Sequence, residues 1–275
     1  MPDQTNRLLI LGAHPDDAEF AAGGLASIYR KMGHAVKMVS VTNGQSGHHE
    51  KSGQELVDIR RAEAKASGQI IDAPYEVWDF PDGYLEPTLE VRERIITEIR
   101  TFKPDLVLTH RPNDYHPDHR AVGQAVQDAS YMVTVPPVVP DVPFMRKDPI
   151  VGYLPDLFTK PTPLQPDVIV DITDAIGTIT RMLGCHVSQV FEWLPFNEGK
   201  LDKVPQSDDD RMLWLRGWVQ SNLELRTDRF RDAIMQAYGD QDALTVAFVE
   251  VFEISEYAGN MDDAARRRLF PFVPH

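Results

Sequence analysis

Short hydrophobic runs alternate with segments of helical periodicity along roughly the first 130 residues of the chain. A run of about four to eight apolar residues bounded by polar ones is typical of a buried parallel strand, and apolar residues recurring roughly every 3.6 positions are typical of a helix. The pattern predicts strands at residues 8–11, 35–42, 75–78 and 105–109, and helices at residues 18–32, 55–68, 88–101 and 119–131.

This alternation predicts an α/β fold with a mostly parallel sheet and helices on both faces, a three-layer, Rossmann-like arrangement. Parallel strands need long crossover connections, and a helix is the usual crossover. In such sheets ligands bind beyond the carboxyl ends of the strands. We therefore expect the functional site in the loops that follow residues 11 and 109.

The rest of the chain is less regular. Residues 135–166 are rich in proline, which predicts a rigid, loop-rich insert that serves either as a wall of the site or as a surface connection. Beyond it the pattern predicts a strand at 167–172, helices at 173–190 and 208–226, and a strand at 245–254. We expect one domain over residues 1–275, with a core at 7–190 and a C-terminal helix and strand extension at 191–275.

Composition excludes several classes of function. The chain has 28 Lys and Arg against 42 Asp and Glu, a net charge of −14, which disfavours nucleic-acid binding. No run of 18 apolar residues occurs, so we expect no membrane insertion, and residues 1–7 lack the pattern of a secretory signal, so we expect a cytoplasmic protein. A single cysteine, Cys185, excludes an internal disulfide.

Two histidine and aspartate clusters follow two of the predicted strands. His14 and Asp17 lie three residues apart across a strand-to-helix turn, so their side chains can converge, and Asp16 between them must point elsewhere. His119 follows the other strand. A catalytic zinc site uses imidazole and carboxylate ligands and leaves one position for water. We therefore expect His14, Asp17 and His119 to bind one Zn²⁺ per chain and Asp16 to act as general base.

His116 lies three residues before His119, so one imidazole can bind metal while the other faces the substrate. We expect the Asp118 carboxylate to accept the second ring proton of His116 and so favour its imidazolium form. The alternative is purely structural, because acids in the first turn of a helix complement its dipole and most histidines are packed or solvated.

The two motifs, Ala13-His14-Pro15-Asp16-Asp17 and His116-Pro117-Asp118-His119, resemble the signature motifs of the PIG-L/LmbE zinc deacetylases. Three further segments are similar to that family, and the resemblance spans residues 8 to about 190. These segments are Arg60-Arg61-Ala62-Glu63, Phe80-Pro81-Asp82-Gly83 and His186-Val187-Ser188-Gln189.

The resemblance implies the same zinc ligands and base, with His116 stabilising the tetrahedral intermediate. It implies that the enzyme removes an acetyl group from an N-acetylated amino sugar or a related small molecule. Arg60 matches the family's helix arginine and is expected to bind a substrate hydroxyl or carboxylate, although it can instead be a solvated charge paired with Glu63. His186 is expected near the substrate, or else it complements a helix dipole.

Three alternatives remain open. The first is a dinucleotide-binding protein, which needs a Gly-x-Gly-x-x-Gly turn that residues 12–17 lack. The second is a metal-dependent hydratase or lyase on the same scaffold, because activated water and an acid–base pair serve either reaction. The third is a non-catalytic protein with structural zinc, which usually requires four protein ligands. A homo-oligomer paired through residues 245–254 is a further expectation.

Overall fold

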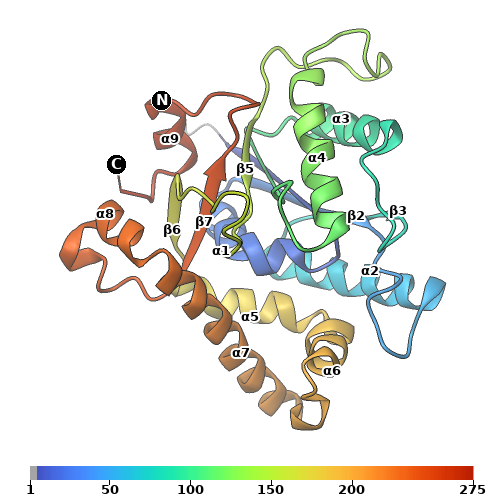
Figure 1. The fold of residues 1–275 in the computed structure, drawn as a ribbon, viewed down its shortest axis with the longest axis vertical. Coiled ribbons are helices and arrows are strands. Elements are labelled where there is room, and N and C mark those ends of the chain that lie inside the picture. The colour runs from blue at the N-terminus through green and yellow to red at the C-terminus, as the bar shows by residue number, and fades with distance from the viewer. Residues whose placement is uncertain (1–4, 275) are drawn as a thin grey trace.

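The computed structural model describes residues 5–274, so part of the N-terminal segment 1–7 examined for a signal lies outside it. Within the described chain, one sheet of seven strands runs in the order β3-β2-β1-β4-β5-β7-β6 (Figure 1). The first five are parallel, and β7 is antiparallel to both of its neighbours. The predicted mostly parallel α/β fold is confirmed. The strands are β1 Arg7–Gly12, β2 Ala35–Thr42, β3 Tyr75–Phe80, β4 Leu106–Thr109, β5 Ile150–Tyr153, β6 Val168–Asp171 and β7 Val249–Ile254.

Helices cover both faces of the sheet (Figure 1). Leu8 and Ile10 of β1 pack into one core and Leu9 and Leu11 into the other, because successive side chains of a strand point to opposite faces. The first core is covered by α1, α5 and α7, and the second by α3 and α4. The helices are α1 Asp17–Lys31, α2 Gly53–Ile70, α3 Leu89–Phe102, α4 Pro117–Met132, α5 Ile176–Gly184, α6 Leu194–Asn197, α7 Asp208–Arg229, α8 Arg231–Asp242 and α9 Asp263–Leu269.

The proline-rich insert contains a strand that the sequence pattern did not predict. β5, Ile150–Tyr153, is fully buried and pairs with β4 in the middle of the sheet. Pro149 directly precedes it and Pro155 follows two residues after its end, and five residues between prolines are too few for a periodicity to be recognised. The prolines on either side therefore delimit the strand rather than exclude it.

The predicted helix at 173–190 is interrupted. A short 3₁₀ turn, Thr173–Ala175, leads into α5, and a π-helical turn, Ser188–Trp193, follows it. In the π-helical turn, Ser188 donates its main-chain N–H and its hydroxyl to Glu63 of α2 at 2.7 and 2.6 Å. Gln189 donates to the Gly47 carbonyl at 2.9 Å. These contacts hold the turn against α2 and the loop after β2, and π-helical turns occur often at functional sites.

The late strand predicted at 245–254 is β7, and it is paired on both sides within the chain. β5 and β6 flank it, so the predicted pairing of this strand across subunits is wrong. Residues of the predicted C-terminal extension thus form an internal strand of the sheet. Helices α8 and α9 were not predicted, since neither has a strong apolar period.

A kink in α1 ties β7 and α7 to the helix. The backbone of Ala22 leaves the helical region, with φ −145° and ψ 16°, which frees main-chain groups on either side of it. The Glu250 carboxylate of β7 accepts from the freed N–H groups of Gly24 and Leu25 at 2.7 and 2.8 Å. Arg226 of α7 donates to the Phe20 carbonyl at 3.2 Å. The two side chains replace the helical bonds lost at the kink.

The approach of β7 to α1 requires glycine at position 24. A Cβ there would lie 2.9 Å from the Glu250 carboxylate and 2.4 Å from the side chain of Ile172. No backbone adjustment of a tenth of an ångström or so relieves such contacts in a packed core.

Among residues 5–274, no helix is long and apolar enough to cross a membrane.

Glu250 makes stability depend on pH. Burial raises its pKa from 4.5 to about 7, against the opposing effect of the Leu25 and Gly24 N–H groups. Its contribution is fully present below the unfolded pKa and is lost as pH rises through the folded pKa. We expect the wild type to lose up to about 3 kcal/mol of unfolding free energy between about pH 4.5 and 8 relative to Glu250→Gln.

Urea unfolding of both proteins at pH 5, 6, 7 and 8 measures this difference. Glu256→Gln, at an exposed position near the end of the same strand, is the control and should follow the wild type. Parallel stability profiles for wild type and Glu250→Gln would show that the carboxyl titrates normally.

Candidate active site

The two predicted clusters meet at the carboxyl ends of neighbouring strands. β1 and β4 are paired with Leu11 opposite Thr109, so the loops that leave them lie side by side. His14 is in the loop after β1, and Asp17 begins α1. His119 lies in the first turn of α4, two residues after Pro117 sets the start of the helix. These side chains therefore lie beyond the carboxyl ends of β1 and β4, where the site is expected.

The metal-binding atoms of three side chains converge. His14 Nδ1 lies 3.2 Å from His119 Nε2 and 3.5 Å from Asp17 Oδ2, and His119 Nε2 lies 3.5 Å from Asp17 Oδ1. Ligands about 2.0–2.1 Å from a tetrahedral zinc ion lie roughly 3.3 Å apart. The ligand types and their spacing therefore fit one zinc ion held by these three side chains, which line the pocket.

In both histidines, the ring nitrogen that points away from the other ligands lies next to a carboxylate. His14 Nε2 lies 3.2 Å from Asp82 and 3.3 Å from Asp118, and His119 Nδ1 lies 3.1 Å from Asp114. Burial alone would lower the pKa of His119, but Asp17 and Asp114 outweigh it and raise the pKa to about 9. Carboxylates in this position orient metal-binding histidines and increase their basicity.

Asp17 is held by hydrogen bonds and by charge. Its Oδ2 accepts from the His14 main-chain N–H at 2.7 Å and lies 3.1 Å from His110 Nε2. Burial alone would raise the pKa of Asp17, but His119 and His110 hold it well below its usual range. The His110 ring also stacks on His119 with centroids 3.9 Å apart, so His110 supports two of the three donors.

Asp16 has a strained backbone. Its φ of 142° is rare for an L residue, and such conformations cost about 1–3 kcal/mol. Its N–H donates to the Tyr75 hydroxyl at 3.1 Å, and its carboxylate lies 3.1 Å from the Arg60 guanidinium. Burial raises the pKa of Asp16 to about 6, against the opposing charge of Arg60. The side chain faces the same pocket as the three donors.

Behind Asp16 lies a buried network that includes His186. The Tyr75 hydroxyl is 3.4 Å from Glu19, and His186 Nε2 is 2.7 Å from the same carboxylate. Ser67 of α2 also donates to Glu19. His186 is completely buried, so its predicted contact with substrate is wrong. It supports Glu19 instead, from a position two residues after the end of α5.

Arg60 is not the solvated charge offered as its alternative. Only 2% of the residue is exposed, and its guanidinium binds the Pro15 carbonyl in addition to Asp16. Glu63, the suggested partner, binds Ser188. Arg60 therefore reaches the pocket from α2 and fixes the turn that carries Asp16. Its contact with substrate stays a prediction.

Asp118 does not orient His116 in the predicted way. Its carboxylate accepts from Gly83 and Leu85 N–H at 2.7 and 3.1 Å and faces His14. His116 instead accepts the Asp118 main-chain N–H at Nδ1, at 3.2 Å. A ring nitrogen that accepts carries no proton, so the imidazole proton of His116 lies on Nε2. The predicted imidazolium form is replaced by a neutral donor.

The pKa of His116 agrees with this tautomer. Burial lowers it, and the neighbouring His14 and His119 rings lower it further. The His116 ring meets His14 edge-on with centroids 4.5 Å apart, beside the converging donors. His116 thus lines the pocket from the start of α4.

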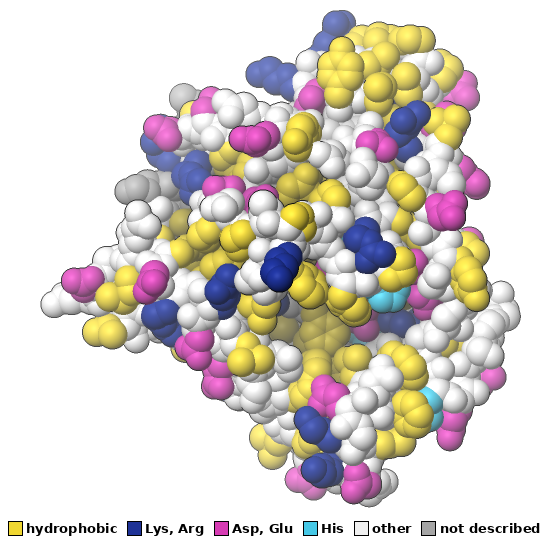
Figure 2. All heavy atoms as spheres, in the orientation of Figure 1, with side chains coloured by type: hydrophobic (Ala, Val, Ile, Leu, Met, Phe, Trp, Pro, Cys, Tyr) yellow, Lys and Arg dark blue, Asp and Glu magenta, His cyan; other side chains and the backbone are white. Residues whose placement is uncertain are grey.

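One pocket of about 390 Å³ is lined by the candidate zinc ligands and by Asp16, Arg60 and His116. The loop after β2 contributes Ser46 and Gly47, and the π-helical turn and α6 contribute Trp193, Leu194 and Asn197. Figure 2 shows histidine, acidic and basic side chains together at one end of a hollow in this face of the molecule.

His48 is buried and His49 is half-buried in the loop after β2. His48 lies 2.8 Å from Glu192, and the His49 ring stacks on Phe196 with centroids 4.1 Å apart. Neither belongs to a group of candidate metal ligands among the described residues. They fasten the loop after β2 to the π-helical turn and α6, and so close one side of the pocket.

Sequence reasoning missed four supporting residues. Asp114 lies between His110 and His116 in the same loop, so its position after a strand could have identified it. Asp82 stands in a segment similar to the family but had no assigned role. Tyr75 and Glu19 gave no signal, because only the folded chain brings β3 beside the start of α1.

The chain is similar in sequence to several known proteins. The family model described as "PIG-L: GlcNAc-PI de-N-acetylase" matches residues 9–130. The chain is 31% identical over 212 residues to the diacetylchitobiose deacetylase of Thermococcus kodakarensis, covering 70% of this chain and 76% of that protein. It is 24% identical over 207 residues to the 4-oxalmesaconate hydratase of Pseudomonas putida, covering 72% and 80%.

The fold is also similar to a solved deacetylase. The N,N'-diacetylchitobiose deacetylase of Pyrococcus horikoshii superposes with a TM-score of 0.70 at 22% identity, covering 92% of this chain and 85% of that chain. At this identity the likeness concerns the architecture alone.

Zinc affinity tests the three donors and the carboxylates behind them. We expect the wild type to bind one zinc ion per chain, and Asp114→Asn to bind it about 10- to 100-fold more weakly, since loss of an outer partner of a metal-binding histidine has this cost. Competition with a chromogenic chelator measures both constants.

His119→Ala should weaken binding further than Asp114→Asn, whereas His49→Ala, outside the donor cluster, should bind like the wild type. Equal affinities for wild type, Asp114→Asn and His119→Ala would place zinc elsewhere.

Proposed function

The chain belongs to the PIG-L family, and on that premise we propose that it is a zinc-dependent hydrolase that removes an acetyl group from an N-acetylated amino-sugar conjugate. The observation that carries the proposal is the convergence of His14, Asp17 and His119 within 3.2–3.5 Å, with Asp16 beside them. Deacetylases that act on amino sugars are among the relatives of this chain. Three donors with an open position suit catalytic zinc better than a closed structural site.

The side chains around this position divide the chemistry between them. Zinc bound to the three donors would supply a water of lowered pKa and polarise the acyl carbonyl. Asp16, with its pKa raised toward neutrality, accepts the proton that the attacking water gives up. The Tyr75 hydroxyl and Arg60 hold Asp16 in its strained conformation, so that its carboxylate stays aimed at the pocket.

His116 acts on the other side of the acyl group. With Nδ1 occupied by the Asp118 N–H, its Nε2–H donates a hydrogen bond to the oxygen that becomes negative as the tetrahedral intermediate forms. A fixed neutral donor needs no rearrangement when charge develops. The proton held by Asp16 then passes to the leaving amine, which completes hydrolysis.

A hydratase is the second candidate, because the chain also resembles the 4-oxalmesaconate hydratase of Pseudomonas putida over most of its length. The same activated water and the same base serve addition to a carbon–carbon double bond. The two reactions differ in product, since only hydrolysis of an amide releases an amine. A cytoplasmic location remains a prediction of the sequence, and so does a homo-oligomer, although not one paired through β7.

His116→Ala should lower kcat about 100- to 1000-fold with KM little changed, because an oxyanion donor acts chiefly in the transition state. Steady-state assays of acetate release measure both constants. A loss under about tenfold would show that His116 is not the oxyanion donor.

Tyr75→Phe should lower kcat while zinc content stays at one ion per chain. The variant leaves the Asp16 N–H without its acceptor but removes no donor atom of the metal site. Full activity in Tyr75→Phe would mean that the strained turn holds without the hydroxyl.

A product assay separates deacetylase from hydratase. We expect zinc-loaded enzyme to release amine and acetate from N-acetylglucosamine conjugates, and Asp16→Asn to lose this activity. Addition of water to an unsaturated dicarboxylic acid, with no amine released from any N-acetyl compound, would reverse the choice.

A further inference from the structure

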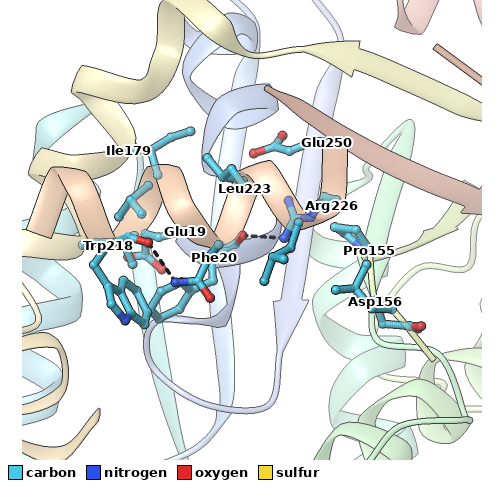
Figure 3. A pocket seen from close by; sticks show the side chains of 14 residues that line it. Glu19, Phe20, Pro155, Asp156, Ile179, Trp218, Leu223, Arg226 and Glu250 are labelled. Atoms are coloured by element: carbon cyan, nitrogen blue, oxygen red, sulfur yellow. Dashed lines mark hydrogen bonds between the residues drawn. The ribbon is translucent and has the colours of Figure 1, made fainter. Parts of the chain in front are cut away.

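A second cavity opens beside the catalytic pocket. It has a volume of about 210 Å³ and lies between α1, α5, α7 and the segment that follows β5. Figure 3 shows Phe20 and Trp218 on one side of it and Pro155 and Asp156 on the other. We call this the Phe20 cavity. Nothing in the proposed reaction uses it.

The walls of the Phe20 cavity are mainly apolar. Phe20 and Trp218 pack edge to face with centroids 5.5 Å apart, and Ile179 and Leu183 of α5 lie deeper. Two charged groups of the wall have partners on α1, since Glu250 accepts two main-chain N–H groups and Arg226 donates to the Phe20 carbonyl through Nη2. Among the described residues, Arg226 Nη1 is buried without a hydrogen-bond partner. What the cavity offers a ligand is chiefly hydrocarbon surface.

The outer wall is held in place and its rim is apolar. Asp156 accepts two hydrogen bonds from Arg111, at 2.6 and 2.8 Å, which fixes the segment after β5. At the rim, Leu157 is 47% exposed and Leu225 is 61% exposed. Exposed apolar side chains gathered around an opening commonly mark a ligand or partner site.

The Phe20 cavity adjoins the catalytic pocket at one residue. Phe20 lines both, one turn after Asp16 and Asp17 along α1. In the segment after β5, the ring of Phe158 has its centroid 6.2 Å from that of Tyr115, which lines the catalytic pocket. Figure 2 shows a hollow with a hydrophobic floor whose end holds the histidine and acidic side chains. A ligand bound at the donors can extend past Phe20.

Size and chemistry indicate the occupant. Complete small-molecule sites measure roughly 300–1,000 Å³, so a cavity of 210 Å³ accepts part of a ligand whose remainder lies in the catalytic pocket. The proposed reaction removes an acetyl group, which is too small to reach past Phe20. The occupant must therefore belong to the other part of the substrate, beyond the ring that carries the amine.

We propose that the Phe20 cavity binds an apolar aglycone, so that the preferred substrates are N-acetyl amino sugars whose glycosidic substituent is an alkyl or aryl group. This inference rests on the proposed function for the position of the acetyl group. Each methylene group that enters such a cavity strengthens binding roughly fourfold. An alkyl chain of several carbons should therefore improve kcat/KM at least about tenfold.

A matched pair of substrates tests the proposal on the zinc-loaded, full-length enzyme. Octyl and methyl β-glycosides of N-acetylglucosamine differ only in chain length, and the octyl compound is used below the concentration at which it forms micelles. We expect kcat/KM for acetate release to be at least about tenfold higher for the octyl glycoside. N-octanoylglucosamine carries the chain on the acyl group and releases octanoate, and by amine release it should be a poorer substrate than the octyl glycoside.

Filling the cavity provides the matched variants. Asn222 is an exposed residue that lines the cavity, so Asn222→Phe should bring the octyl-to-methyl ratio of kcat/KM down toward one. Ser221→Phe places the same ring at the neighbouring exposed position, which does not line the cavity, and should keep the wild-type ratio. Comparing ratios removes any general effect of the substitution on folding.

Binding to Asp16→Asn keeps the test independent of turnover. Trp218 lies in the wall, so tryptophan fluorescence should report octyl glycoside binding at least about tenfold tighter than methyl, with the difference lost in Asp16→Asn combined with Asn222→Phe. If this pattern appears but no glycoside releases acetate, the proposed reaction fails and the cavity's ligand class stands.

Equal kcat/KM and equal dissociation constants for the two glycosides would overturn the proposal and leave the deacetylase intact. Preference for N-octanoylglucosamine would also overturn it, since the apolar group would then be the acyl chain. A dimer that dissociates in Asn222→Phe, with no effect of the octyl glycoside, would assign the cavity to a second copy of the chain.

Discussion

The orientation of one imidazole ring governs the whole site. Two carboxylates, Asp82 and Asp118, lie at 3.2 and 3.3 Å from His14 Nε2 and turn Nδ1 toward Asp17 and His119. The carboxylates are fixed in turn, since Asp118 accepts from the Gly83 and Leu85 N–H groups and Asp82 from that of Ser46. If the ring were rotated by 180°, carbon atoms would replace Nε2 next to the carboxylates and Nδ1 next to Asp17 and His119. The three candidate zinc ligands would then no longer converge.

Helix α1 links this site to the rest of the molecule. Its first residue is Asp17, and the strained Asp16 directly precedes it. The main-chain groups freed by its kink at Ala22 are bound by Glu250 of β7 and Arg226 of α7. The elements that hold the kink also form the wall of the Phe20 cavity. Strand β7 and helix α7 therefore hold the helix of the catalytic site and also shape the space beside it.

The sequence predicted what local spacing determines. Strand and helix periodicity placed the loops after β1 and β4 at one sheet edge, and the i to i+3 spacing put Asp17 within reach of His14 and His116 beside His119. Long-range contacts were not predictable in this way. Three features depend on residues that are far apart in sequence. They are the burial of His186 against Glu19, the binding of the Asp118 carboxylate to the Gly83 N–H instead of His116, and the place of β7 between β5 and β6.

The position of the bound metal tests the central claim most directly, because His14 can offer either ring nitrogen. Anomalous scattering at the zinc edge, from a crystal grown with zinc, should give one peak about 2.0–2.1 Å from His14 Nδ1 and His119 Nε2, next to Asp17. A peak between His14 Nε2, Asp82 and Asp118, which also form a candidate ligand group, would contradict the account. So would the absence of any peak near these residues.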